Sequence, residues 1–147
     1  MVWNVYRSTV TRYSKQQAGL AYLAVALYAD STEGERYIEF QLSDEEDRES
    51  GYCIVDGPPT AFQPGGLEAL VTMLTSHATV YGGLDSASFN GADLVLTLND
   101  EAQRIFEWPR ELTLRLEITA EELNALRKSL PEVLAVGPDG VVPTIRL

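Results

Sequence analysis

The sequence predicts an α+β domain in which two to three helices pack against a twisted antiparallel sheet. Three observations support this fold class. Asn90-Gly91 is a strong signal for a two-residue hairpin, because both turn positions favour positive φ, and alternating strands flank it. Residues 112–118 alternate between aliphatic and polar side chains, as a half-buried strand does. Thr119 and Glu122 then form a capping box, which predicts the start of a helix.

The first half of the chain is expected to contribute strands. Residues 2–10 are rich in β-branched and aromatic side chains, and they predict the first strand. Residues 20–29 carry apolar side chains on both faces, as a central strand does. Residues 37–42 alternate, which predicts Ile38, Phe40 and Leu42 inside and Tyr37, Glu39 and Gln41 outside. A short strand over 52–55 follows.

Helical spacing appears between the strands of the second half. Leu67, Leu70, Val71 and Leu74 share one helical face, which predicts a helix within residues 58–77. A short helix is expected over 99–106, and a last helix runs to Leu130, ending before a proline. Residues 135–147 form a tail or an edge strand. Because no repeat or linker interrupts the chain, residues 1–147 are interpreted as one domain.

The net charge indicates which classes of partner to expect, and the cysteine content indicates the cellular compartment. The net charge of −11 repels nucleic acid and anionic membranes and attracts basic proteins, so neither nucleic-acid nor membrane binding is expected. The most apolar stretch, residues 20–29, is far shorter than the roughly 20 residues that span a bilayer. A single cysteine, Cys53, excludes an intrachain disulfide and suits a reducing compartment. We therefore expect a cytoplasmic protein.

The search for catalytic residues gives none. His77 is the single histidine, and no nucleophile motif surrounds it. Cys53 has no positive neighbours in the sequence that would favour its thiolate. Gly82-Gly83 lacks the lysine and the spacing of phosphate-binding loops, and the acidic residues do not follow the calcium-loop pattern. We therefore expect a protein that is not an enzyme and that uses no metal or cofactor.

A dense acidic segment is the strongest candidate for a binding surface. Its acids steer a basic protein toward the surface, and aromatic side chains beside them supply the buried contacts. Tyr37 and Tyr52 are the candidate aromatic contacts, with Tyr81 as a possible third. The predicted steering residues are Asp44, Glu45, Glu46, Asp47 and Glu49.

The order of elements resembles the immunity protein 10 family of bacterial polymorphic-toxin systems over roughly residues 20–134, with 81–134 the best-matched part. The resemblance rests on Tyr37–Gln41 before an acidic loop, on Tyr81-Gly82-Gly83-Leu84, and on the strand, helix, strand and helix that follow. It implies a small cytoplasmic α+β protein, not an enzyme, that binds and neutralises a cognate toxin domain by occlusion. Relative to the family pattern, the resemblance implies that residues 58–77 are an insertion and that the tail after Leu134 is a further departure.

Two other functions stay open at this point. A non-catalytic adaptor or small-ligand-binding domain would use a cavity between the sheet and the helix over 67–74. A hydrolase that uses carboxylates is the third, because acids are plentiful.

Overall fold

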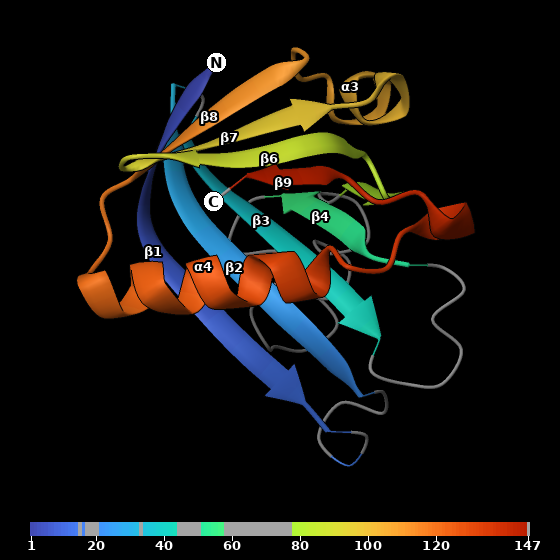
Figure 1. The fold of residues 1–147 in the computed structure, drawn as a ribbon. Coiled ribbons are helices and arrows are strands. Elements are labelled where there is room, and N and C mark those ends of the chain that lie inside the picture. The colour runs from blue at the N-terminus through green and yellow to red at the C-terminus, as the bar shows by residue number, and fades with distance from the viewer. Residues whose placement is uncertain (15, 17–20, 33, 44–50, 58–77, 147) are drawn as a thin grey trace, which may run out of the picture.

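In the part of the chain that the structure describes, nine strands pair into one mixed sheet (Figure 1). A computed structural model of the chain describes residues 1–14, 16, 21–32, 34–43, 51–57 and 78–146. The strands are β1 (Val2–Tyr13), β2 (Tyr22–Ser31), β3 (Gly34–Ser43), β4 (Cys53–Gly57), β5 (Ala78–Tyr81), β6 (Leu84–Asn90), β7 (Asp93–Leu98), β8 (Glu111–Leu116) and β9 (Thr144–Arg146). The helices are α3 (Asp100–Phe106), α4 (Ala120–Val133) and the 3₁₀ turn η2 (Pro138–Gly140). The strand order is β5-β4-β3-β2-β1-β8-β7-β6-β9.

The predicted fold class, an α+β domain with an antiparallel sheet, is wrong. Strands make up more than half of the described residues, and two strand pairs are parallel, β1 with β8 and β6 with β9. An alternating pattern defines the two faces of a strand, but it specifies neither the neighbouring strand nor its direction. Among the described residues only α3 and α4 are α-helices. The predicted helix over 67–74, with the whole 58–77 segment, lies outside them.

Several local predictions are confirmed. The hairpin between β6 and β7 turns at Asn90-Gly91, and Gly91 has a φ of 62°. Thr119 and Glu122 form the capping box of α4, with both of its hydrogen bonds present. The helix itself continues to Val133, so its predicted end before Pro131 is wrong, because the fixed φ of proline is compatible with helical backbone.

The main core lies between the curved sheet and α4, which crosses β1, β2 and β3 (Figure 1). Leu126, Leu130 and Val133 of α4 are fully buried in it. Strand β2 is central, as predicted, and every side chain from Leu23 to Leu27 is buried. At about 25 cal/mol per Å² of apolar surface removed from water, this two-sided burial makes the central strands a main source of stability.

The face of β3 that points away from α4 is also covered. Tyr37 and Glu39 were expected to lie outside, yet both are buried. Alternation correctly separated them from Ile38 and Phe40, which belong to the core cluster. It could not report that the second face of the sheet is covered as well, because polar side chains usually mark a face exposed to solvent.

The end of the chain adds an edge strand. β9 pairs in parallel with β6, so that Ser86, Ala87 and Ser88 lie opposite Thr144, Ile145 and Arg146. The backbone reaches this edge through η2, after Val136 has accepted a hydrogen bond from the Tyr52 amide at 2.8 Å. This pairing places side chains from the last residues beside β6 and β7.

Candidate functional site

The predicted steering acids, Asp44, Glu45, Glu46, Asp47 and Glu49, all lie outside the described residues. Their attachment points are described: β3 ends at Ser43, and the chain resumes at Gly51 just before β4. In the register of the sheet, Cys53 lies opposite Tyr81 at the end of β5. The acidic segment is therefore attached at the strand ends beside Tyr81.

The predicted aromatic contacts occupy interior positions. Tyr52 is 1% exposed, and its hydroxyl accepts a hydrogen bond from the Leu84 amide at 3.0 Å. Tyr37 is 5% exposed, and its hydroxyl donates to Glu39 at 2.9 Å. Neither side chain has surface to offer a partner in this conformation. Tyr81, by contrast, is 59% exposed.

A chain of polar side chains runs along the second face of the sheet. Glu39 accepts hydrogen bonds from the Tyr37 hydroxyl and from the Gln41 amide, and the Cys53 thiol donates to Gln41 Oε1 at 3.9 Å. Burial, followed by the charge of Glu39, raises the pKa of Cys53 to about 11 and that of Tyr22 to about 12. The same two causes raise the pKa of Tyr37. These groups therefore stay uncharged at neutral pH, and Cys53 is a poor nucleophile.

A buried ion pair joins β3 and β4. The Arg36 guanidinium donates to Asp56 and also lies over the Trp3 ring, with Cζ 5.3 Å from its centroid. Burial raises the pKa of Asp56, although the nearby Arg36 charge acts in the opposite direction. Trp3 packs edge-on against Trp108 at 5.1 Å between centroids, so the pair sits beside an aromatic cluster. Its packed surroundings indicate a structural role.

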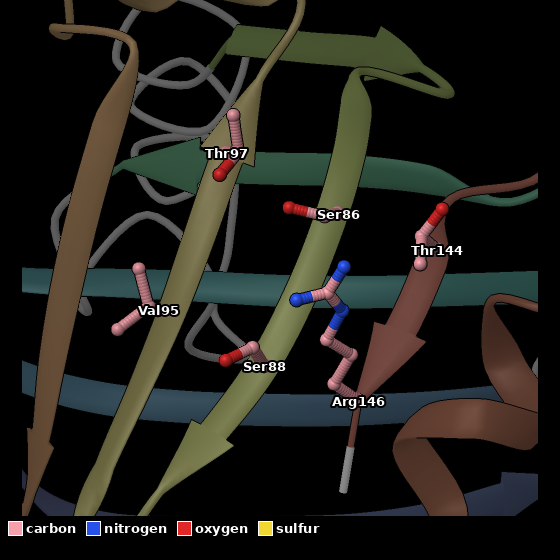
Figure 2. A pocket seen from close by; sticks show the side chains of 6 residues that line it. All are labelled: Ser86, Ser88, Val95, Thr97, Thr144 and Arg146. Carbon is pink, nitrogen blue, oxygen red and sulfur yellow. The ribbon is translucent and has the colours of Figure 1, made fainter.

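An open groove lies on the outer face of β7, β6 and β9 (Figure 2). Its volume is about 320 Å³. Four hydroxyl side chains, one valine and one arginine line it: Ser86, Ser88, Val95, Thr97, Thr144 and Arg146. Sequence reasoning missed this site, because its residues come from three segments that only the strand pairing brings together. The sole signal was the polar alternation of Ser86 with Ser88, which is common on exposed strands.

Two searches of the described part of the chain gave nothing further. No group of three or more histidine, cysteine, aspartate or glutamate residues there is arranged to hold a metal ion. No helix there has the length and apolar character needed to cross a bilayer.

Comparison of the chain with protein-family models, with curated proteins and with solved structures found no match. The resemblance to the immunity protein 10 family is therefore still a prediction. The function has to be argued from the charge, the exposed side chains and the groove.

Proposed function

We propose that the protein binds a basic partner protein through an acidic surface and blocks it by occlusion, as an immunity protein does with a cognate toxin domain. The observation that carries this proposal is the net charge of −11. Five of the acidic residues that produce this charge are concentrated in the segment 44–49. A field of this sign accelerates the encounter with a cationic protein and disfavours anionic partners.

The described edge beside that segment supports the proposal. Ser43 and Gly51, which flank the acids, lie at the same end of β3 and β4 as Tyr81 does on β5. Because Tyr81 is largely exposed and Tyr37 and Tyr52 are buried, Tyr81 replaces them as the aromatic contact. Tyrosine is enriched among the residues that dominate binding energy, since it buries a large rigid surface and keeps a polar tip. Asp44, Glu45, Glu46, Asp47 and Glu49 remain the predicted steering residues.

The proposal predicts that a toxin domain is encoded beside this chain's gene, and that domain is the partner to test. Co-expression is expected to restore growth of cells that produce the toxin. The purified proteins are expected to form a complex whose association rate falls as salt is raised, because screening weakens long-range attraction. Continued cell death together with no detectable complex would refute the proposal.

Two variants separate steering from contact. Replacing Asp44, Glu45 and Glu46 by Asn, Gln and Gln is expected to lower the association rate about tenfold at low salt and to change dissociation little. Tyr81→Ala is expected to accelerate dissociation instead. Matched controls are the triple Glu35→Gln, Glu111→Gln and Glu117→Gln, at exposed positions elsewhere, and Tyr6→Ala for the aromatic. Equal effects of the test and control variants would place the contact elsewhere.

The second candidate function is a non-catalytic adaptor or small-ligand-binding domain. One observation favours it, the groove on β7, β6 and β9. The cavity predicted between the sheet and the 67–74 helix falls outside the described residues and gives no support either way.

A further inference from the structure

Strand register arranges the groove residues into two rows. Thr97, Ser86 and Thr144 lie opposite one another across β7, β6 and β9. Val95, Ser88 and Arg146 form the neighbouring row in the same register. Because adjacent strands lie about 4.8 Å apart, three hydroxyl groups line up over roughly 10 Å, with a guanidinium one row away.

Figure 2 shows how the arginine completes this arrangement. The Arg146 side chain leaves β9 and reaches across β6, so that its guanidinium lies between Ser86 and Ser88. The groove thus gathers one cation with five donor groups and the hydroxyls of four side chains. No carboxylate belongs to its lining.

Four of the eight described arginines form ion pairs, and Arg146 is among the four that do not. Arg12, Arg36, Arg110 and Arg115 each pair with a carboxylate. Within the described ranges, the Arg146 side chain has neither an ion pair nor a hydrogen bond, although its backbone pairs with β6, and the hydroxyls of Ser86, Ser88, Thr97 and Thr144 likewise have no hydrogen bond. A planar guanidinium beside uncommitted hydroxyls is well suited to the oxygens of a phosphate, sulfate or carboxylate group.

We propose that this groove binds an oxyanion, with Arg146 as the charged donor and Ser86 and Ser88 as the adjoining neutral donors. Its volume exceeds that of inorganic phosphate, so a ligand has room for a substituent along the row of hydroxyls. Hydroxyl-bearing substituents, such as those of a sugar, match that row because each serine or threonine both donates and accepts. The site lies on β7, β6 and β9, whereas the acidic segment is attached between β3 and β4.

The test is an amide NMR titration of the ¹⁵N-labelled chain with inorganic phosphate, at constant ionic strength held with chloride. Saturable shifts are expected at the amides of β6, β9 and the facing part of β7. Parallel titrations with sulfate, acetate and a phosphorylated sugar distinguish the sources of the oxyanion, and the sugar phosphate is expected to bind most tightly. Shifts that never saturate, or that spread over all basic residues, would overturn the proposal.

Variants assign the effect to the groove. Arg146→Gln is expected to weaken phosphate binding at least about tenfold, which corresponds to about 1.4 kcal/mol for a lost charge-assisted contact. Arg146→Lys keeps the positive charge but loses the planar set of guanidinium N–H donors, so a loss of phosphate affinity smaller than that of Arg146→Gln is expected. Ser88→Ala is expected to weaken binding about threefold. Arg104→Gln removes the same charge from the exposed surface of α3 and is expected to leave binding unchanged.

Two outcomes separate this proposal from the function proposed above. If Arg146→Gln binds phosphate as well as the parent chain does, the groove is not the site, whatever the toxin assay shows. If Arg146→Gln abolishes phosphate binding and still protects cells, the groove is a second site that is independent of the partner surface. The spectrum of each variant without ligand verifies that it is folded.

Discussion

The two partners of the Arg36–Asp56 ion pair differ in their exposure to water, and this difference predicts unequal losses of stability when each is replaced. The Asp56 side chain is 6% exposed, whereas that of Arg36 is 24% exposed and rests on the Trp3 ring. In the described part of the chain, Asp56 Oδ1 and Arg36 Nε have no hydrogen-bond partner. The carboxylate therefore depends mainly on Arg36 for compensation, with a smaller contribution from the Gly57 amide, while the guanidinium has partial access to water.

We predict that Arg36→Met destabilises the protein more than Asp56→Asn does. Removal of Arg36 leaves a buried carboxylate without its cation, which costs about 3–5 kcal/mol of unfolding free energy. Asp56→Asn leaves a cation that reaches solvent and keeps its ring contact, so the loss is about 1–2 kcal/mol. In the Arg36→Met background, Asp56→Asn removes the stranded charge and is expected to increase stability. The same substitution therefore changes the sign of its effect.

The pH dependence follows from the direction of the pKa shift. Burial raises the pKa of Asp56, and loss of Arg36 removes the charge that opposes this shift. Between the unfolded and folded pKa values the native state binds more protons than the unfolded state, so stability falls as pH rises through the folded pKa. The deficit of Arg36→Met is therefore expected to be full at pH 7 and smaller at pH 5.

Urea unfolding followed by tryptophan fluorescence measures these changes, because Trp3 and Trp108 lie against each other near the ion pair. The four proteins of the double-mutant cycle are compared at both pH values. Equal losses for the two single variants, or a deficit of Arg36→Met that does not change with pH, would refute the reasoning. So would a double variant less stable than Arg36→Met alone.

Two further predictions concern single groups. The Glu122 carboxylate accepts a hydrogen bond from the backbone amide of Ser8 in β1 at 2.7 Å, and it also takes part in the capping box of α4. These hydrogen bonds lower the pKa of Glu122. Its contribution is thus present above the unfolded pKa and lost as pH falls, so Glu122→Gln is expected to destabilise by about 1–2 kcal/mol at pH 7 and by little at pH 3 in urea unfolding. Glu121→Gln is the control, and a penalty equal at both pH values would contradict the reasoning. Because the pKa of Cys53 is about 11, its thiolate is rare at pH 8, and alkylation by iodoacetamide is expected to be at least about 100-fold slower in the native protein than in denaturant. Similar rates in the two states, measured by mass spectrometry, would show that the thiol is accessible and ionised.

What the sequence predicted correctly was local. The Asn90-Gly91 turn and the Thr119–Glu122 capping box depend on backbone preferences of neighbouring residues, and both are found. The partner of β1 depends on distant residues, since Val2 pairs with Thr113 of β8. No local pattern reports such a pairing, and this is why the fold class was predicted wrongly.

For the candidate site, too, the sequence predicted what depends on neighbouring residues and missed what depends on distant ones. The acidic segment was visible because its residues are consecutive, although the described chain shows only its attachment points. Tyr37 and Tyr52 were taken for surface residues because tyrosine suits both environments, and only the packing distinguishes them. The groove needs Ser88 and Arg146 side by side, which follows from the β6–β9 register alone.

The position of β1 in the sheet also bears on how the nascent chain folds. β1 is paired with β2 on one side, and on its other side Val2–Val5 pair with β8, more than a hundred residues later in the chain. If the β1–β2–β3 meander forms before β8 is synthesised, the Val2–Val5 edge has unpaired backbone groups, and such an edge can pair with other molecules. Synthesis of β8 pairs these four residues, so a chain arrested before β8 would be prone to aggregate through them.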